Sequence, residues 1–427
     1  MIGAYGLIGS VVCARLRAGG WAVVGVGRDV ARARRSRPDI TWVERDLRDL
    51  TTPETWLDLL EGIDAVVNCA GALQDNPRDD LAAVHDAAPA ALFRACQQVG
   101  VRRVIHVSAA GVAPDSSTRF FQTKSAAEKA LLASDLDGVI LRPGLVLAPQ
   151  AYGGTALLRG LAGFPLFIPS IRTQSRIQVV SADDVAETVR RALLPGAPAR
   201  GSYDLVDDEQ LSLPSILRRL RAWLGFPDAP VIVLPMIVAR AAAMGADGLA
   251  YLGWKSPMRS TSVRQLEEGV AGDGGPWRAA FGIEPQSLDA MLAAHPAGVQ
   301  ERWFARAWFA KPLGLFSLSA FWTYSGLCGA FSLAAAASVL TQAGWSSGAA
   351  NAAVLAGVVI DVLISAALTF RSTAWLALLG AIATAFGYLV LGTLVRPDLW
   401  LDPLGAYAKI IPATVLAATL LALMDDR

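Results

Sequence analysis

Short apolar runs alternate with amphipathic stretches along the first part of the chain. The apolar runs lie at Trp21–Val26, Thr41–Val43, Ala65–Asn68, Val104–Val107 and Val139–Leu141, and helical patterns fill the intervals, as at Leu81–Gly100 and Ser125–Ala133. Strands that are apolar on both faces and separated by helices are typical of a parallel sheet covered on both sides. The pattern therefore predicts an α/β fold with a doubly wound parallel sheet, in which ligands bind outside the carboxyl ends of the strands.

The pattern changes near residue 312. Four long apolar segments follow, at about 315–340, 349–370, 374–395 and 404–424. Each has about 20 residues or more, which is enough to cross roughly 30 Å of hydrocarbon as a helix. The sequence therefore predicts a four-helix transmembrane bundle over residues 312–427, with the lipid bilayer as its partner.

Residues 209–311 have helical rather than alternating patterns. Leu211–Gly225 carries apolar residues at helical spacing with arginines on the opposite face, and Met236–Leu252 is a second, more apolar helix. This second helix fits two places equally well, a membrane surface or the interior of a small lobe. We expect residues 1–208 to form the α/β domain and residues 209–311 a small helical lobe and linker.

Composition agrees with a membrane protein and excludes several other classes. The chain is 53% hydrophobic and only 18% charged, below the quarter or so that is usual for soluble proteins. A net charge of +1 gives no global attraction to nucleic acid. The four cysteines form no CxxC pair and the three histidines show no ligand spacing, so we predict neither a disulfide framework nor a metal site.

Three glycines at the start of the chain form a GxxGxxG loop that leads into a helical pattern. Glycine removes the Cβ that would block a pyrophosphate, and the helix end offers unpaired N–H donors. The predicted cofactor-binding residues of this loop are Gly3, Tyr5, Gly6, Leu7, Ile8 and Gly9. A dinucleotide fold needs a strand of about five residues before the loop, and only Met1 and Ile2 precede it here. Either the strand is truncated or the true start codon lies upstream, and we favour the upstream start.

Other cofactor contacts are expected where the predicted strands end. Arg28 follows the second strand, where a cation suits a 2′-phosphate, so NADP(H) is favoured over NAD(H). The alternative is that Arg28 belongs to a solvated basic face. The remaining residues at strand ends are Asp46 and Leu47, then Cys69, Ala70 and Gly71, then Ser108, and then Pro143 and Gly144. Lys124 lies at the start of the helix that follows Ser108.

Taken in chain order, these motifs resemble the extended or atypical branch of the short-chain dehydrogenases/reductases over roughly residues 1–300. The motifs that carry the resemblance are GAYGLIGS at 3–10, Asp46-Leu47, NCAG at 68–71, Ser108, Lys124, RPG at 142–144 and the run from Ile177 to Ala186. The resemblance implies a Rossmann-type domain that binds NAD(P), with Lys124 as both a catalytic and a cofactor-binding residue.

The resemblance also implies a catalytic tyrosine four residues before the lysine, and this chain has Phe120 there. In the family the tyrosine transfers a proton, the lysine lowers its pKa, and a serine polarises the carbonyl. A phenyl ring has no proton to give, and losing a general acid typically lowers a rate 10²–10⁴-fold. Ser108 is the best-placed serine, with Ser116 and Ser117 as alternatives, and Tyr152 is a weak candidate for the missing hydroxyl.

The apolar C-terminal third resembles the DoxX-like membrane domains. Basic residues gather on one side of the predicted spans, at Arg302, Arg306, Lys311, Arg371 and Arg427, against mainly Arg396 and Lys409 on the other. By the positive-inside rule both termini and the nucleotide domain lie in the cytoplasm of a multi-pass inner-membrane protein. Asp361 in the second span is a functional candidate. It could pair with Lys409, or be protonated and inert.

Two functions fit these features. The first is a membrane-anchored, NADP(H)-binding reductase that acts on an apolar substrate such as a quinone or isoprenoid lipid. The second is a catalytically inactive nucleotide-binding module that assembles or regulates a membrane redox complex, a role that resembles that of an accessory subunit of respiratory NADH dehydrogenase. Phe120 is the departure that keeps the second function open. The sequence predicts no particular oligomeric state.

Overall fold

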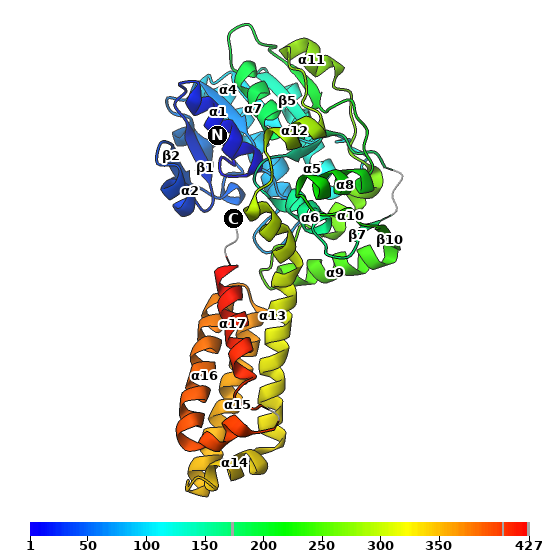
Figure 1. The fold of residues 1–427 in the computed structure, drawn as a ribbon. Coiled ribbons are helices and arrows are strands. Elements are labelled where there is room, and N and C mark those ends of the chain that lie inside the picture. Colours follow the sequence, from blue (N-terminus) through cyan, green and yellow to red (C-terminus); the bar gives the residue numbers. More distant parts are fainter. Residues whose placement is uncertain (172–174, 404, 425–427) are drawn as a thin grey trace. The chain divides into compact units, whose positions relative to one another are not determined.

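The computed structural model describes residues 1–171, 175–403 and 405–424. The chain forms two compact units. The first contains Met1–Asp247 and Ser256–Ala305, and the second contains Gly248–Lys255 and Arg306–Arg427. The boundaries predicted at 208 and 311 remain predictions, but the Rossmann part and the helical lobe group together in the first unit (Figure 1).

A parallel sheet forms the centre of the first unit. Its strands are β1 (Val24–Gly27), β2 (Thr41–Glu44), β3 (Ala65–Asn68), β4 (Arg103–Val107), β5 (Asp137–Pro143) and β9 (Gly201–Leu205). β1 pairs with β2, the other four follow the order β3-β4-β5-β9, and every pair is parallel. The apolar runs predicted as strands are therefore confirmed as strands. The observed strand ends differ from the predicted ones by up to three residues.

Ile2 joins the two parts of the sheet. It forms parallel bridges with Val26 of β1 and Asn68 of β3. The N–H of Ile2 donates to the carbonyl of Val67 at 2.9 Å, and the N–H of Cys69 donates back to the carbonyl of Ile2 at 3.0 Å. A single residue thus takes the place expected for the first strand, in the middle of the sheet and directly before the glycine loop.

Helices cover both faces of this sheet, because alternate strand residues point to opposite cores. Ile105 and Val139 pack in one core with α1 (Leu7–Ala18), α7 (Ala182–Ala192) and α11 (Gly275–Phe281). Val104 and Ile140 pack in the other core. The elements on that side are η2 (Pro53–Trp56), α3 (Leu57–Leu60), α4 (Ala88–Val99) and α5 (Arg119–Ala133). Helix α2 (Ala31–Ser36) lies against β2 and contributes Ala33 to the first core. The doubly wound α/β arrangement is confirmed.

A helical lobe completes the first unit. Its core contains α6 (Gly153–Ala162), α8 (Leu213–Trp223) and α12 (Leu288–Ala294), together with two short parallel strand pairs. These pairs are β6 (Leu145–Leu147) with β8 (Val179–Ser181) and β7 (Ile168–Ile171) with β10 (Val231–Leu234). The predicted helix at Met236–Leu252 is α9 (Met236–Tyr251), and α10 (Ser260–Glu268) follows it. The lobe thus uses chain on both sides of residue 208.

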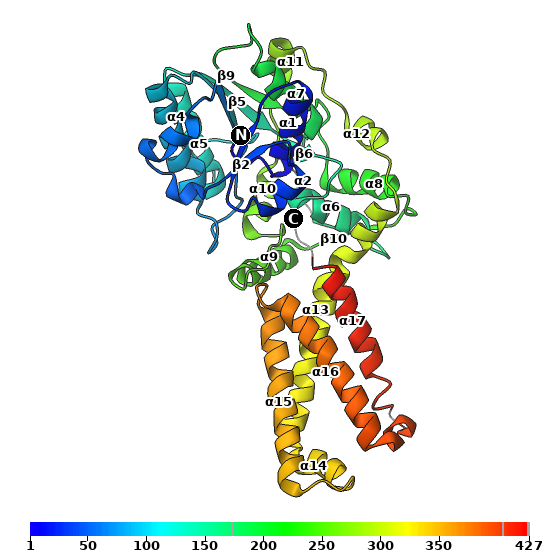
Figure 2. The ribbon, with the colours of Figure 1, turned by 90° about the vertical axis from the view of Figure 1, so that its left-hand side faces the viewer.

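The second unit is helical. Its elements are α13 (Val299–Phe331), α14 (Leu333–Thr341), α15 (Ser347–Thr369), α16 (Ala374–Val395), η4 (Pro397–Leu401) and α17 (Ile410–Ala422), of which α13 begins in the first unit. Helix α16 packs against α15 and also against α17 (Figure 2). Among the described residues, α15 and α16 are long and apolar enough to cross a membrane, and α13 with α14 could form a third, broken span.

Two of the four predicted spans differ from the helices observed. The first, at 315–340, divides at Ser332, and the axes of α13 and α14 meet at 82°. The fourth, at 404–424, has only 13 helical residues, about 20 Å of helix, because turns precede the helix, which begins at Ile410. Residue 404 and residues 425–427, including Arg427, lie outside the described residues.

Asp361 lies inside the second unit with two hydrogen-bond donors. The hydroxyl of Ser325 on α13 donates to one carboxyl oxygen at 2.6 Å, and that of Tyr388 on α16 donates to the other at 3.0 Å. Lys409 is instead exposed directly before α17, and the structure of the described residues has no Asp361–Lys409 ion pair. Asp361 therefore links three helices, as polar groups in membrane bundles do.

Candidate nucleotide-binding site

The glycines of the N-terminal loop lie very close to other backbone segments of the protein. Gly3 has a φ of 68°, and a Cβ there would lie 2.8 Å from the backbone N of Ala70. A Cβ on Gly9 would lie 2.2 Å from the carbonyl oxygen of Gly3. Gly6 is the N-cap of α1, no side chain caps the helix, and its first turn has no acidic residue. The first amides of α1, with Leu7 and Ile8 in its first turn, are therefore free to bind an anion.

Tyr5 and Arg28 meet at the carboxyl end of β1. The backbone N–H of Arg28 donates to the Tyr5 hydroxyl at 3.2 Å, and the Tyr5 ring covers Gly27. The Arg28 guanidinium forms an ion pair with Asp79 at 2.8 Å and also donates to the carbonyl of Arg78. Arg28 therefore lies at the position predicted for a 2′-phosphate contact, but it is paired with a carboxylate of the 71–80 segment.

Asp46 and Leu47 follow β2, as predicted. Asp46 caps the short 3-10 helix η1 (Leu47–Asp49) by accepting from the backbone N–H of Arg48 at 3.0 Å. Its carboxylate also forms an ion pair with the Arg48 side chain at 2.7 Å. Asp46 therefore stabilises the turn after β2, and its contact with the cofactor remains a prediction.

The NCAG segment forms a compact turn at the end of β3. The buried Asn68 side chain accepts from the backbone N–H of Ala70 at 3.0 Å and contacts Nδ1 of His106 at 3.2 Å. Burial raises the pKa of the Cys69 thiol to about 12, so the thiol is protonated at neutral pH. Gly71 follows, and the turn lies directly against the glycine loop through Gly3 and Ala70.

Ser108 and Lys124 come together at the carboxyl end of β4. Ser108 is 5% exposed, and its Oγ has no hydrogen-bond partner among the described residues. Lys124 is also 5% exposed, and its Nζ donates to the carbonyl of Val107, the residue before Ser108, at 3.2 Å. Burial lowers the pKa of Lys124 to about 8, although nearby Glu128 opposes the shift. A buried hydroxyl without a partner is rare in proteins and fits a site that a ligand completes.

Phe120 lies one helical turn before Lys124 on α5. Nζ of Lys124 is 5.5 Å from the centre of the Phe120 ring, and the ring packs edge-on against His85 with centroids 5.3 Å apart. Phe120 thus stands beside the lysine, as the resemblance implies for the tyrosine. It contributes packing and a cation–π contact but no proton.

His85 belongs to the same cluster and is not among the predicted site residues. Its Nε2 accepts from the backbone N–H of Ala72 at 3.0 Å, and its Nδ1 lies 3.1 Å from the Thr123 hydroxyl. Burial holds its pKa well below the usual range, so the ring is neutral and carries its proton on Nδ1. It lies in the π-helical turn η3 (Ala83–Ala87), which an analysis of hydrophobic periodicity does not reveal.

Of the other residues considered as hydroxyl donors, Ser117 makes a side-chain contact, and Tyr152 and Ser116 make contacts through their backbone groups. Tyr152 precedes α6, and its backbone N–H donates to the Thr155 hydroxyl at 3.2 Å. Ser117 donates to Glu268 of α10, and the Ser116 carbonyl accepts from Gln122 at 2.8 Å. None of these contacts joins them to Lys124.

Pro143 ends β5, and Gly144 joins it to β6 of the β6–β8 pair. The carbonyl of Pro143 accepts from the N–H of Ala110 at 2.9 Å. A Cβ on Gly144 would lie 2.5 Å from the carbonyl oxygen of Gln178, which precedes β8. The glycine is therefore required for the approach of two backbone segments, which is a structural reason independent of any cofactor.

A polar network ties the segment after NCAG to the lobe. Gln74 donates to Asp247 of α9 at 3.1 Å and accepts from the Thr261 hydroxyl of α10 at 3.0 Å. Asp247 also forms an ion pair with the buried Arg259 at 2.9 Å. Residues remote in sequence build this network, so the sequence patterns gave no sign of it.

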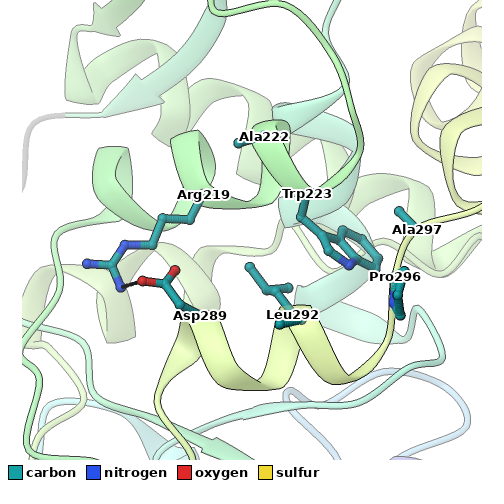
Figure 3. A pocket seen from close by; sticks show the side chains of 8 residues that line it. Arg219, Ala222, Trp223, Asp289, Leu292, Pro296 and Ala297 are labelled. Atoms are coloured by element: carbon teal, nitrogen blue, oxygen red, sulfur yellow. Dashed lines mark ion pairs between the residues drawn. The ribbon is translucent and has the colours of Figure 1, made fainter.

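A separate surface pocket of about 450 Å³ lies between α8 and α12 (Figure 3). Arg219 and Asp289 face each other across it at 3.4 Å, and Trp223 and Leu292 form its apolar part. None of the predicted site residues lines it. The candidate site is therefore the cluster at the strand ends rather than this pocket.

Comparisons with known proteins agree with this division of the chain. Residues 3–194 match a family model described as NAD(P)H-binding, and residues 319–418 match the model of the DoxX-like family. Sterol demethylase protein B of Methylococcus capsulatus is 26% identical over 289 residues, which cover 61% of this chain and 86% of that protein.

Solved structures show the same fold in the first unit. The NADPH-dependent quinone oxidoreductase QOR2 of Escherichia coli, complexed with NADPH, has a TM-score of 0.52 at 19% identity, covering 69% of this chain and 98% of its own. The enzyme WbmG of Bordetella bronchiseptica, in complex with NAD and UDP, has a TM-score of 0.51 at 19% identity, covering 69% and 91%. The predicted resemblances are thus confirmed: the chain joins an N-terminal NAD(P)-binding Rossmann-type domain, with the fold of the short-chain dehydrogenases/reductases, to a C-terminal DoxX-like domain.

Proposed function

We propose that the protein is a membrane-anchored NAD(P)(H)-dependent oxidoreductase that reduces an apolar carbonyl compound of the membrane. The observation that carries the proposal is the pair formed by Lys124 and Ser108. Both side chains are buried, Lys124 has a lowered pKa, and the Ser108 Oγ has no partner among the described residues. Perturbed titratable groups of this kind concentrate at functional sites.

The residues around this pair fit a dinucleotide. The first-turn amides of α1 and the loop from Gly3 to Gly9 would hold the pyrophosphate, and the turn at Cys69–Gly71 would lie along the cofactor. When bound, the reduced nicotinamide supplies a hydride. We assign Lys124 to the adjacent ribose as well as to the reaction, as the family resemblance implies.

In this proposal Ser108 donates a hydrogen bond to the substrate oxygen and Lys124 donates a proton to it. The Ser108 hydroxyl, which makes no other hydrogen bond in the described structure, donates one to the carbonyl oxygen. The Lys124 ammonium then gives a proton to that oxygen as the hydride reaches the carbon, and water restores the proton to Lys124. With a pKa of about 8 the lysine is mostly protonated at neutral pH yet acidic enough to act as a general acid.

The substrate class follows from the membrane domain and from the names of two similar proteins. The DoxX-like domain and the apolar helices α15 and α16 favour a compound dissolved in the bilayer. One relative is named for sterol demethylation and one structural neighbour for quinone reduction. We therefore propose a quinone or an isoprenoid lipid such as a sterol ketone.

The direct test measures NADPH and NADH oxidation by the purified full chain in detergent, with short-chain quinones and with an extract of membrane lipids. Oxidation that depends on one of these acceptors is expected. Tight nucleotide binding without turnover on any acceptor would reject the enzymatic proposal.

Nucleotide binding without turnover would favour a nucleotide-binding module that assembles or regulates a membrane redox complex. Phe120 supports this alternative, because its ring lies next to Lys124 and contacts His85. Under this alternative a variant that has lost nucleotide binding would fail to recover its membrane partners in pull-down experiments. An unchanged complex would exclude it.

Cofactor preference gives a separate prediction. Arg28→Ala is expected to weaken NADPH binding roughly tenfold or more while changing NADH binding little, because charge-assisted contacts to a phosphate contribute about 1.5–3 kcal/mol. The guanidinium must leave Asp79 to make this contact, so Asp79→Asn is expected to strengthen NADPH binding. Fluorescence titration with both nucleotides measures these effects.

Arg35→Ala serves as the matched control, since Arg35 is exposed in the same arginine-rich region, on α2. Equal weakening of NADPH and NADH by Arg28→Ala would contradict the 2′-phosphate role and leave Arg28 as a structural partner of Asp79.

We also propose that the first unit lies on the cytoplasmic side of the inner membrane, where NADPH is available. The support is the basic residues Arg302, Arg306 and Lys311 before the apolar part of α13 and Arg371 between α15 and α16. A single cysteine placed at the exposed Trp345, beyond the opposite ends of these helices, should react with a membrane-impermeant maleimide on intact spheroplasts. Reaction only after lysis would reverse the orientation.

A further inference from the structure

Helix α9 has its small residues inside and its large apolar residues outside. The buried positions are three alanines, Ala239, Ala243 and Ala246. The exposed large side chains are Ile237, Val238, Met244, Leu249 and Tyr251. Ile237 is 76% exposed, Met244 70% and Tyr251 74%. A surface helix of a water-soluble domain has the opposite arrangement, with polar residues on its outer face.

Little charge interrupts this outer face. Arg240 forms an ion pair with Glu267 of α10 at 2.8 Å, and Asp247 is turned toward Gln74 and Arg259. The neighbouring strand β10 adds the exposed Ile232 and Val233. Contiguous exposed apolar surface of this kind marks a binding site for a protein or a membrane.

A second observation identifies the membrane. The last four residues of α9 and the residues that follow it, Gly248–Lys255, belong to the helical second unit. There the carbonyl of Leu252 accepts from the N–H of Arg371 at 3.0 Å, and the indole N–H of Trp254 donates to the carbonyl of Thr369 at 2.8 Å. The Arg371 guanidinium also lies over the Trp254 ring at 5.7 Å. Thr369 and Arg371 lie where α15 ends and the turn to α16 begins.

That turn connects the two helices that are long and apolar enough to cross a bilayer. It therefore lies at the boundary between hydrocarbon and water, where tryptophan and arginine side chains are favoured. The C-terminal end of α9 is attached to this boundary. With 16 residues α9 is about 24 Å long, shorter than the roughly 30 Å needed to cross the hydrocarbon.

We infer that α9 is an interfacial helix that lies in the surface of the bilayer, with Ile237, Val238 and Met244 among the acyl chains and Ala239, Ala243 and Ala246 against the protein. The partner of this surface is lipid. Apolar area drives the insertion, as in other interfacial helices. The chain then touches the bilayer through α9 as well as through its DoxX-like domain.

The position of α9 deepens the proposed function, on which this step rests. Asp247 of α9 binds Gln74, and Gln74 lies three residues after Gly71 of the candidate cofactor site. This hydrogen bond connects α9 with the segment that follows Gly71, so we expect an apolar substrate to enter the candidate site from the bilayer beside α9.

The experiment places a nitroxide spin label on α9 in the full chain, reconstituted in bilayers of phosphatidylcholine and phosphatidylglycerol. Cys328, the exposed native cysteine, is replaced by alanine, and the label is attached at Val238→Cys or Met244→Cys. Leu132→Cys on α5 is the matched control, because Leu132 is 47% exposed and Val238 46%. Collisions with oxygen, which concentrates in lipid, are compared with collisions with a water-soluble nickel chelate.

Labels at Val238 and Met244 should meet oxygen more often than nickel, and the label at Leu132 should show the reverse. Ready access of nickel to both α9 labels would overturn the inference. Protection of both from either reagent would also overturn it and would indicate a protein partner. The measurement needs no catalytic turnover, so an inactive protein would reject the proposed function without affecting this result.

Discussion

Replacing Lys124 with methionine should lower kcat for NAD(P)H-dependent reduction by about 10²–10⁴-fold, the range usual for the loss of a general acid. Methionine preserves the length and the apolar contacts of the side chain but has no ammonium group. The variant loses the donor that lies next to Ser108 and, in the proposed mechanism, the proton for the substrate oxygen. Steady-state kinetics with the acceptor identified for the native protein measure the change.

Lys129→Met is the matched control, because Lys129 lies on the same helix and is exposed. Its activity should equal that of the native protein. If Lys124→Met retained full turnover, the proton would have to come from another group, and the assignment of the catalytic pair would be wrong.

The pH dependence of kcat tests the same assignment. A lysine that acts as an acid must be protonated, so the rate should be level below its pKa of about 8 and fall about tenfold per pH unit above it. Because the Lys124→Met variant has lost this group, the decline above pH 8 should be absent from its residual activity.

Lys124→Met should also make the protein more stable. Burial lowers the pKa of Lys124 from 10.5 to about 8. Between these values the unfolded chain binds more protons than the folded chain, so stability rises as the pH rises through this window. Below pH 8 both states are protonated, and the buried charge costs the folded state on the order of 3 kcal/mol. A higher Tm in detergent at pH 7, together with lost turnover, would distinguish a catalytic lysine from a structural one.

The arrangement of the first unit could be predicted because local patterns determine it. Apolar strands such as Val104–Val107 are buried on both faces, and parallel strands separated by helices have few alternative arrangements. The residues at their carboxyl ends, Ser108 and Gly71 among them, therefore lie at the same edge of the sheet. The family resemblance implies that Lys124 and Ser108 act at one site, and in the structure Lys124 donates to the carbonyl of Val107, the residue before Ser108.

The parts that sequence patterns missed depend on contacts between distant segments. His85 joins the site through Ala72 and Thr123, which no spacing rule connects. Arg28 is at the predicted strand end, but its pairing with Asp79 depends on the conformation of the intervening loop. The break at Ser332 between α13 and α14 could not be predicted either, because hydropathy measures how apolar a segment is and not whether its backbone stays helical.

The glycine loop gives the second large prediction. Gly9→Ala should weaken the binding of both NADPH and NADH roughly tenfold to a hundredfold, from an overpacking cost of about 1–3 kcal/mol. The added Cβ would lie 2.2 Å from the carbonyl oxygen of Gly3 and 3.0 Å from Cα of Ala4. Both are backbone atoms, so no flexible side chain can move away. The loop must shift from α1, and its amides leave the positions proposed for the pyrophosphate. Fluorescence titration measures both affinities.

Gly154→Ala separates this clash from the general effect of alanine in a helix. Gly154 is exposed in the first turn of α6, and a Cβ there meets nothing within 4 Å. Alanine favours a helix over glycine by about 1 kcal/mol, so propensity alone would stabilise both variants. Loss of nucleotide binding in Gly9→Ala but not in Gly154→Ala therefore has to come from the contact with Gly3. Native affinity in both variants would show that the nucleotide is not held by this loop, and the role proposed for α1 would fail with it.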